Sequence, residues 1–370
     1  MKFKLITVVG TRPELIRLSQ IIRVFDKKFN HILIHTNQNY DKNLNKVFFN
    51  QLQIRKPKYI LKRKNNSAIK FISNTLIEIE KIIIKENPQM FFILGDTNSG
   101  LSAIVAKKYK IPIFHYEAGN RCFDERVPEE VNRKIIDHIS DINLTYSSFA
   151  KQNLIKEGIK QDRIIKVGSP LKEVFLSNEK KILQSKILNK LNLKRNTYFL
   201  VSYHREENVD NPDKLKNFLT ILNKLSIKYK FKIIISTHPR TEKRLKNILL
   251  KRNSLLKFEK PFGYFDYVNL QKNSLITLSD SGSISEEASI LNFKAISLRN
   301  TLERQEAMES PSVLMSTLDV NYLLRCVEFL IQEKNKNQIY KDYDVNNVSE
   351  KISKIILSYT HYINTEVWKK

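Results

Sequence analysis

The chain has 370 residues, 41% of them apolar, which suffices for two domains with buried cores and excludes a disordered chain. No stretch approaches the roughly 18 consecutive apolar residues of a membrane helix, so we expect no membrane insertion. The two cysteines, Cys122 and Cys326, lie far apart and predict neither a disulfide framework nor a metal site. This cysteine usage fits a reducing compartment, the cytoplasm.

The net charge of +26 comes from 64 basic and 38 acidic residues. One interpretation is a nucleic-acid or membrane partner. The other is a lysine-rich proteome whose lysines cover solvated faces. We favour the second and expect no nucleic-acid partner, because the lysines are scattered along the whole chain without a nucleic-acid-binding motif.

Short apolar strands alternate with amphipathic helices along the first half of the chain. The first apolar run ends at Gly10, too early for a signal peptide, and predicts a buried strand. A helix follows, with Pro13 at its first turn, where the missing N–H has no cost. The strands predicted here are 5–9, 32–35, 90–94, 113–116 and 142–146, and a long helix is predicted over 68–85.

The alternation starts again after about residue 175. The predicted strands are 199–203, 233–236, 275–279 and 295–298, and the predicted helices are 213–228, 283–291 and 320–333. Two such runs predict an α/β fold with two Rossmann-like, doubly wound parallel sheets. We set an N-terminal domain at 1–175 and a C-terminal domain at 176–347. A last helix at 348–370 is expected to pack back on the N-terminal domain.

Ligands of doubly wound sheets bind outside the carboxyl ends of the strands, so the motifs at these ends matter most. Gly10-Thr11-Arg12-Pro13-Glu14 joins a strand to a helix, where a tight turn and a helix N-terminus favour an anion. Arg12 and Arg17 add positive charge. An ordinary tight turn is the alternative.

Three acidic residues of the first half are candidates for acid/base chemistry. Asp96 and Glu117 follow predicted strands, and Glu129 begins a predicted helix, with Arg121 and Arg133 interleaved. A carboxylate directly after an apolar strand is expected to be partly buried, with a shifted pKa. The three carboxylates then converge on one site. Helix capping and surface salt bridges are the alternatives.

The second half carries two further motifs. His204-Arg205 ends a predicted strand, which fits anion contact or proton transfer, although a lone histidine is more often structural. A turn at 281–283 opens a helix and offers N–H groups to a phosphate, with Glu287 on the same helix face for a ribose diol. An ordinary capped helix start is the alternative. Arg304 follows the next strand.

Taken together, these motifs resemble the nonhydrolysing UDP-N-acetylglucosamine 2-epimerase family over nearly the whole chain. The resemblance implies a GT-B-like architecture with the active site between two domains, a UDP-sugar substrate, no cofactor, no metal and a homodimer. It implies catalytic roles for Asp96, Glu117, Glu129 and His204. The substrate-binding residues that it implies are Arg12, Arg17, Arg121, Arg133, Arg205, Tyr267, Ser281, Gly282, Ser283, Glu287 and Arg304.

Three departures from the usual family pattern matter. The stretch from Asn120 to Glu129 looks like the UDP-N-acetyl-L-fucosamine synthase branch, which implies C2 epimerisation of a UDP-N-acetyl-6-deoxy-L-talosamine type of substrate for surface polysaccharides such as capsule or O-antigen. Gln305 stands where a proline is usual. Gln38-Asn39 stands where some members have the Gln-His pair associated with activation by the substrate, so this activation is in question.

The mechanism implied by the resemblance removes the C2 proton as UDP leaves C1, and then re-adds UDP and protonates the opposite face of C2. Two faces need differently placed carboxylates, and the leaving diphosphate needs cations and N–H groups. The alternatives are a UDP-N-acetylglucosamine 2-epimerase giving UDP-N-acetylmannosamine, a GT-B glycosyltransferase, and a basic nucleic-acid-binding protein.

Overall fold

The computed structural model describes residues 2–38, 42–62, 67–237, 239–245, 253–299, 304–334 and 338–370, and only the backbone at 42–46, 206–207 and 239–240. The chain divides into unit 1 (residues 1–177 and 341–370) and unit 2 (residues 178–340). The return to unit 1 comes at residue 341, earlier than the predicted 348. The reason is Asp342, whose carboxylate accepts hydrogen bonds from the Ser148 main-chain N–H (2.8 Å) and the Lys166 ammonium (2.5 Å).

Within the described residues, unit 1 has a seven-stranded parallel sheet in the order β3-β2-β1-β4-β5-β6-β7. Its strands are β1 (Lys4–Val9), β2 (Asn30–His35), β3 (Tyr59–Ile60), β4 (Met90–Leu94), β5 (Ile113–Tyr116), β6 (Ile142–Thr145) and β7 (Ile164–Lys166). Its helices are α1 (Arg12–Lys28), α2 (Lys42–Gln51), α3 (Ala68–Glu86), α4 (Ala103–Lys108), α5 (Pro128–Ile139), α6 (Ser148–Lys156), the first part of α7 (Leu171–Leu183) and α16 (Val348–Glu366), with 3₁₀ turns at Gly100–Ser102 and Gln161–Arg163.

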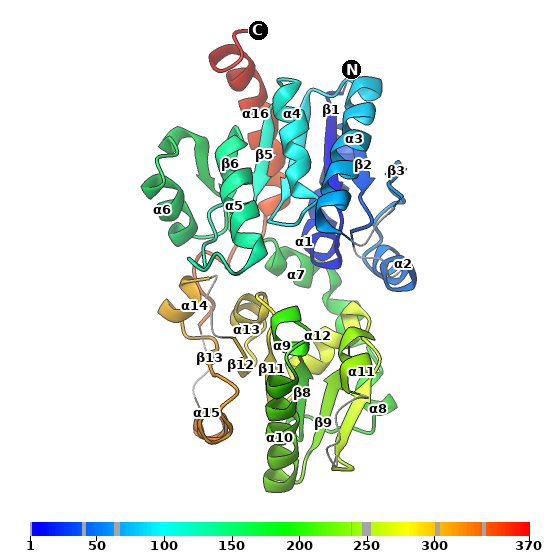
Figure 1. Ribbon diagram of the computed structural model, residues 1–370, viewed down its shortest axis with the longest axis vertical. Coiled ribbons are helices and arrows are strands. Elements are labelled where there is room, and N and C mark those ends of the chain that lie inside the picture. Colours follow the sequence, from blue (N-terminus) through cyan, green and yellow to red (C-terminus); the bar gives the residue numbers. More distant parts are fainter. Residues whose placement is uncertain are drawn as a thin grey trace. The chain divides into compact units, whose positions relative to one another are not determined.

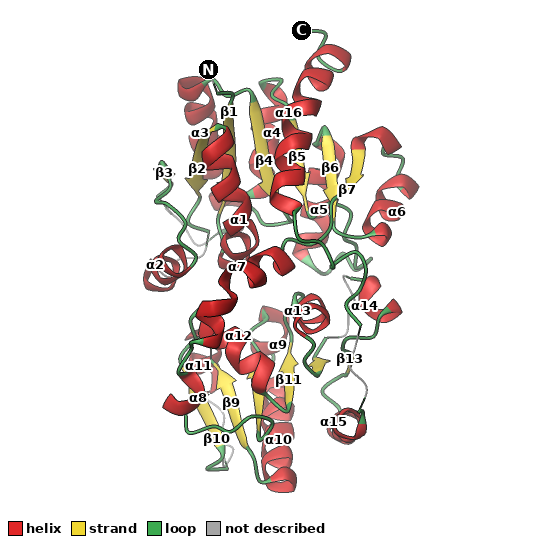
Figure 2. Cartoon of the chain, turned by 180° about the vertical axis from the view of Figure 1, so that it is seen from behind, coloured by secondary structure: helices red, strands yellow, loops and turns green. Residues whose placement is uncertain are grey.

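Helices cover both faces of this sheet. Helices α3, α4 and α5 pack side by side on one face (Figure 1), and α1 packs against α16 on the other (Figure 2). The central strands β4 and β5 are buried along their whole length. Such strands must be apolar on both faces, which explains why they read as continuous apolar runs in the sequence.

Within the described residues, unit 2 has a six-stranded parallel sheet in the order β10-β9-β8-β11-β12-β13. Its strands are β8 (Tyr198–Ser202), β9 (Lys232–Ser236), β10 (Leu256–Glu259), β11 (Ile276–Ser279), β12 (Ala295–Ser297) and β13 (Leu314–Met315). Its helices are α8 (Ile187–Lys190), α9 (Glu206–Val209), α10 (Pro212–Tyr229), α11 (Pro239–Leu245), α12 (Tyr264–Asn273), α13 (Ile284–Leu291), α14 (Glu306–Glu309) and α15 (Val320–Gln332).

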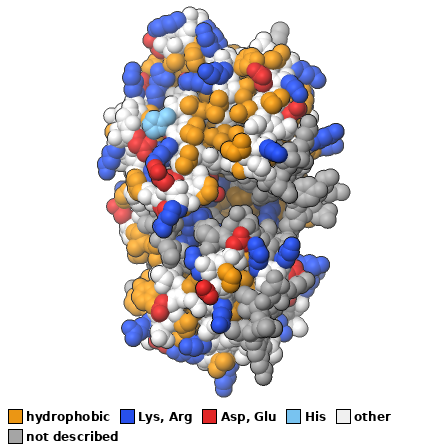
Figure 3. Space-filling view, in the orientation of Figure 1, with side chains coloured by type: hydrophobic (Ala, Val, Ile, Leu, Met, Phe, Trp, Pro, Cys, Tyr) orange, Lys and Arg blue, Asp and Glu red, His pale blue; other side chains and the backbone are white. Residues whose placement is uncertain are grey.

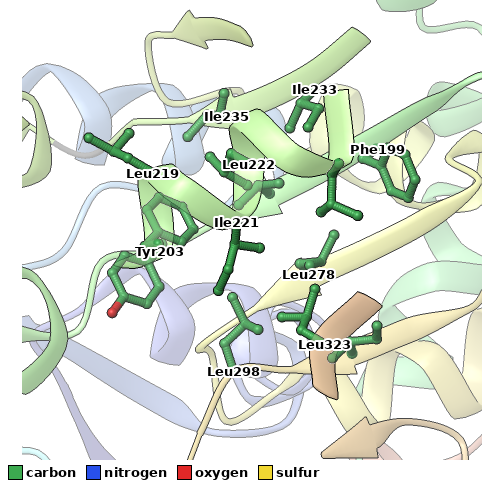
Figure 4. Packing of buried hydrophobic residues seen from close by; sticks show 14 of the residues in the cluster. Phe199, Tyr203, Leu219, Ile221, Leu222, Ile233, Ile235, Leu278, Leu298 and Leu323 are labelled. Atoms are coloured by element: carbon green, nitrogen blue, oxygen red, sulfur yellow. The ribbon is translucent and has the colours of Figure 1, made fainter. Parts of the chain in front are cut away.

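The main core of unit 2 lies between its sheet and helices α10 and α15. Helix α10 begins at the Asn211 cap, whose side chain accepts hydrogen bonds from two main-chain N–H groups. Leu219 and Leu222 of this helix pack with Ile235 of β9 and Leu278 of β11 (Figure 4). Burying each such side chain contributes about 1.5–3 kcal/mol, and this core holds the carboxyl ends of β8 and β11 in place.

The predicted fold class, two Rossmann-like α/β domains of the GT-B kind, is confirmed by these two parallel sheets. The edge strands β3, β7, β10 and β13 were not predicted, because they are only partly buried and do not form apolar runs in the sequence. In the described parts of the chain, no helix is long and apolar enough to cross a membrane.

Candidate active site

Polar loops follow β1, β4 and β5, which are neighbours in the sheet of unit 1. Asp96 lies in the loop after β4, and Glu117 directly follows β5. Glu117 has a positive φ of 70°, a strained backbone conformation for a residue with a side chain. A Cβ atom built on Gly95, in the loop after β4, would lie 3.4 Å from Oε2 of Glu117. The loops that carry Asp96 and Glu117 therefore meet at this point.

Each of the two carboxylates has a cationic partner. The guanidinium of Arg133 lies 2.7 Å from Asp96 Oδ2, with the Nε atom donating a hydrogen bond. Arg17 Nη1 lies 3.6 Å from Glu117 Oε1, and the Tyr146 hydroxyl donates to Glu117 Oε2 at 3.4 Å. We call these four charged residues, Asp96, Glu117, Arg17 and Arg133, the carboxylate cluster.

Of the adjacent pair Glu129 and Glu130 at the start of α5, Glu130 is buried and Glu129 is exposed. Glu130 accepts hydrogen bonds from the main-chain N–H groups of Cys122 (3.2 Å) and Phe123 (3.1 Å) and from Arg133 Nη1 (2.8 Å). Burial opposes its ionisation, but these bonds outweigh burial and lower its pKa. Glu130 therefore ties the loop after Glu117 to the carboxylate cluster, while Glu129 faces solvent beside it.

The Gly10-Thr11 turn after β1 is held by the buried side chain of Glu14. Its Oε2 atom accepts hydrogen bonds from the N–H groups of Gly10 (3.0 Å) and Thr11 (2.7 Å), and Oε1 accepts from Thr97 (3.3 Å). Burial raises the pKa of Glu14 to about 7, although these bonds oppose the shift. Arg12, half-buried on the same turn, has its guanidinium 5.8 Å from the Phe48 ring centre.

Arg121 was predicted to bind substrate, but its side chain is fully buried within unit 1. It lies 2.7 Å from the buried carboxylate of Asp137 and makes two hydrogen bonds, of 2.7 Å and 2.6 Å, to Glu157. Asp137 also accepts a hydrogen bond from the Gly119 N–H (3.2 Å), and its Oδ1 atom lies 2.8 Å from His115 Nδ1. This geometry favours a positioning role for Arg121, in which it holds the loop that carries Glu117.

Gly119 shows how closely that loop is packed. Its φ of 81° lies in the left-handed region, and an added Cβ would lie 2.2 Å from the Ala150 carbonyl oxygen. Both the backbone conformation and the space therefore require glycine. Since this residue is two positions after Glu117, the direction of the Glu117 side chain depends on it.

In unit 2, His204 and Arg205 follow β8, as predicted. The His204 side chain is 42% exposed, and its Nδ1 atom lies 3.1 Å from Oδ1 of the buried Asp280, which follows β11. The neighbouring strands β8 and β11 thus bring the histidine and the carboxylate together. Burial raises the pKa of Tyr267 on α12, and the negative charges of Glu287 and Asp280 raise it further.

The turn at 281–283 opens α13, as predicted, and its serines are bonded to one another. The Ser281 and Ser283 hydroxyls are 3.0 Å apart, and Ser283 donates to Glu287 Oε1 at 2.8 Å. Gln271 donates to the other oxygen of Glu287 at 2.6 Å. Half-buried Glu287 is therefore held in one orientation beside half-buried Gly282.

Arg304, predicted to bind UDP, is buried, and its Nη2 atom lies 3.5 Å from Oε2 of the fully buried Glu286. Glu303 of the same motif lies outside the described residues. Glu286 was not singled out from the sequence, and neither were Glu130, Asp280 and Tyr146. For the two glutamates the available signal is helical phase, because one member of each Glu-Glu pair must face inward.

The position of Arg121 yields a first prediction. Arg121→Gln leaves Asp137 as a buried charge without its cation, and breaking a buried ion pair costs about 3–5 kcal/mol. We therefore expect a clear fall in Tm, measured by calorimetry, with little change in KM for the UDP-sugar. Arg126→Gln, on the same segment with an 89% exposed side chain, is the control and should change neither quantity. An unchanged Tm with a raised KM would instead show that Arg121 contacts the substrate.

Comparison with known proteins agrees with this geometry. The chain matches the model of the UDP-N-acetylglucosamine 2-epimerase family over residues 24–357. It is similar to the solved UDP-N-acetylglucosamine 2-epimerase of Rickettsia bellii, with 45% identity, full coverage of both chains and a TM-score of 0.92. The structure of the Methanocaldococcus jannaschii enzyme, solved with UDP-GlcNAc and UDP, is 38% identical with a TM-score of 0.89 and covers 96% of this chain and 100% of its own.

A relative with a different named substrate is also found. The UDP-2,3-diacetamido-2,3-dideoxy-D-glucuronate 2-epimerase of Pseudomonas aeruginosa is 30% identical, over 91% of this chain and 93% of its own. Proteins of the family are thus named for more than one UDP-sugar. With its two Rossmann-like domains and carboxylates at the strand ends of unit 1, the chain belongs to the UDP-N-acetylglucosamine 2-epimerase family and is a nonhydrolysing UDP-sugar 2-epimerase.

Proposed function

We propose that the enzyme epimerises C2 of a UDP-activated N-acetyl-6-deoxy-L-hexosamine, converting the L-talosamine type of sugar to UDP-N-acetyl-L-fucosamine. The observation that carries this proposal is the stretch from Asn120 to Glu129, which begins three residues after Glu117 and departs from the usual family pattern. In the structure it presents the Phe123 ring, whose side chain is 69% exposed. An apolar ring suits the methyl group that a 6-deoxy sugar has in place of the C6 hydroxyl.

UDP-N-acetylglucosamine is the second candidate substrate, and the names of the Rickettsia and Methanocaldococcus relatives favour it. Both candidates use the same chemistry at C2. Family membership speaks against the glycosyltransferase and nucleic-acid-binding alternatives. The choice between the two sugars therefore depends on groups that contact C5 and C6, and not on the acid/base residues.

The proposed reaction assigns the proton transfers to unit 1 and the binding of UDP chiefly to unit 2. Asp96, Glu117 and Glu129 act as acid/base groups at C2, because protonating both faces of one carbon needs more than one carboxylate. Arg17 and Arg133 hold two of these carboxylates in place. The diphosphate is received by the N-terminus of α13 and by Arg304, with His204 and Arg205 as further contacts.

NMR of the purified enzyme with each UDP-sugar in D2O tests the substrate. We expect deuterium to enter C2 of the 6-deoxy-L-talosamine nucleotide together with formation of the fucosamine epimer, because every proton returned to C2 then comes from solvent. Efficient conversion of UDP-N-acetylglucosamine to its manno epimer, without turnover of the talo-configured sugar, would contradict the proposed substrate and leave the epimerase activity intact.

The carboxylates give a second test. General acid/base groups typically contribute roughly 10²–10⁴-fold in rate, so Asp96→Asn, Glu117→Gln and Glu129→Gln should each lower kcat by at least about a hundredfold. Their UDP affinity should stay unchanged. Glu125→Gln, with a 77% exposed side chain on the same segment, is the matched control and should keep full turnover. A variant with a lowered Tm and normal kcat would show that its residue is structural.

Glu287 tests the place of UDP. A hydrogen bond to a charged group contributes about 1.5–3 kcal/mol, so losing the ribose contact should weaken UDP binding to Glu287→Ala by about tenfold or more in calorimetry. Glu309→Ala, exposed at the end of α14 in the same unit, is the control. If the folded Glu287→Ala protein binds UDP with unchanged affinity, Glu287 does not contact the ribose.

We propose further that the enzyme works as a homodimer in the cytoplasm, where it supplies an activated sugar for surface polysaccharides. Exposed apolar side chains support self-association: Ile69, Ile77 and Ile84 on α3, and Val131 and Ile135 on the neighbouring α5. Figure 3 shows apolar side chains gathered on this face of unit 1, among scattered Lys and Arg. Light scattering that gives the mass of a single chain at micromolar concentration would contradict the dimer.

A further inference from the structure

Asp280 is fully buried at the carboxyl end of β11 and receives hydrogen bonds on both carboxylate oxygens. Oδ2 accepts from the main-chain N–H groups of His204 (3.0 Å) and Arg205 (2.9 Å) and from Asn208 Nδ2 (3.2 Å). Oδ1 accepts a longer bond from the same His204 N–H (3.2 Å) and lies 3.1 Å from Nδ1 of the His204 ring. The carboxylate therefore fixes both the backbone of the loop after β8 and the imidazole that this loop carries.

The chemistry of this contact sets the position of a proton. An ionised carboxylate offers only acceptors, so His204 Nδ1 must be the donor in this pair. Burial opposes ionisation of Asp280, but the charge and hydrogen bond of His204 and the bonds from Arg205 and Asn208 outweigh burial and lower the pKa of the carboxyl. Ser202 Oγ also lies near Nδ1, at 3.4 Å.

We propose that Asp280 is a positioning residue of the epimerase reaction, which holds the exposed ring of His204 in one orientation and keeps its proton on Nδ1 so that Nε2 is the atom presented to ligand. The inference rests on the proposed function insofar as His204 contacts the substrate. The partner of one ring nitrogen determines the state of the other, which is how a carboxylate behind a histidine acts in other enzymes.

An amide at position 280 should reverse this arrangement. Asp280→Asn has a single side-chain oxygen. We expect this oxygen at the Oδ2 position, because the N–H groups of His204 and Arg205 and the Asn208 amide all donate there. The NH2 group then lies against His204 Nδ1. The amide then donates to Nδ1, and the neutral ring must carry its proton on Nε2. The substitution therefore changes the tautomer while it preserves the size of the side chain and most of the loop contacts.

Long-range ¹H–¹⁵N NMR of the full chain, with the His204 signals assigned by their loss in His204→Asn, measures this tautomer. We expect the neutral ring to be protonated on Nδ1 in the wild type and on Nε2 in Asp280→Asn. Asp26→Asn removes the carboxylate 2.6 Å from His31 in unit 1 and is the matched control, which should leave His204 unchanged. A wild-type His204 protonated on Nε2 overturns the proposal, and this result needs no Asp280 variant to fold.

Turnover separates positioning from support of the fold. When His204 is present, we expect Asp280→Asn to lower kcat by at least about tenfold. When His204 is replaced by Asn, the same substitution should lower kcat by less than about twofold, because Asp280 acts on the reaction only by orienting the His204 ring. Equal losses in both backgrounds would overturn the proposal and assign Asp280 to the loop alone. Full turnover of His204→Asn would instead refute the assigned role of His204, and the tautomer measurement would still stand.

Discussion

Buried carboxylates that accept hydrogen bonds from main-chain N–H groups hold the functional loops of both units. A buried ionised group is costly unless it is well bonded, so each of these carboxylates fixes the loop that satisfies it. The loops that they bond follow parallel strands, so the sheet supplies the positions of these loops and the carboxylates supply their shape. The loops held in this way are those bonded to Glu14, Glu130, Asp137, Asp280 and Asp342.

Central strands and the loops after them could be predicted from the sequence because parallel strands are buried on both faces and read as apolar runs. Which of Glu129 and Glu130 is buried could not be predicted from the sequence. The two side chains point in directions about 100° apart around α5, so the answer depends on how the helix is rotated about its axis. The contacts of Arg121 could not be predicted for a related reason. An arginine beside acidic residues predicts ionic contact, but only the structure shows that Asp137 and Glu157 are its partners.

The same scaffold leaves the sugar open to variation. In the proposed reaction, the carboxylate cluster acts at C2 and the loop bonded to Asp280 contacts the diphosphate. Both are held by bonds within the fold, which a change of sugar must preserve. The segment after Asn120 is also held through its main chain, by the N–H groups of Cys122 and Phe123 that bond to Glu130. Its side chains can therefore change without loss of these bonds. A change of substrate at C5 or C6 is compatible with constant chemistry at C2.

His115 and His204 each lie beside a buried aspartate in the described part of the chain, but they differ in exposure. His115 is 1% exposed, and its ring nitrogens lie 2.8 Å from Asp137 and 2.9 Å from the Gly95 carbonyl oxygen, both acceptors within unit 1. His204 contacts an equally buried aspartate, but its side chain is 42% exposed. The carboxylate orients the ring in both pairs. Of these two rings only that of His204 reaches the surface, so its aspartate supports the proposed role in which one ring nitrogen is presented to ligand, while the aspartate at His115 ties together groups inside unit 1.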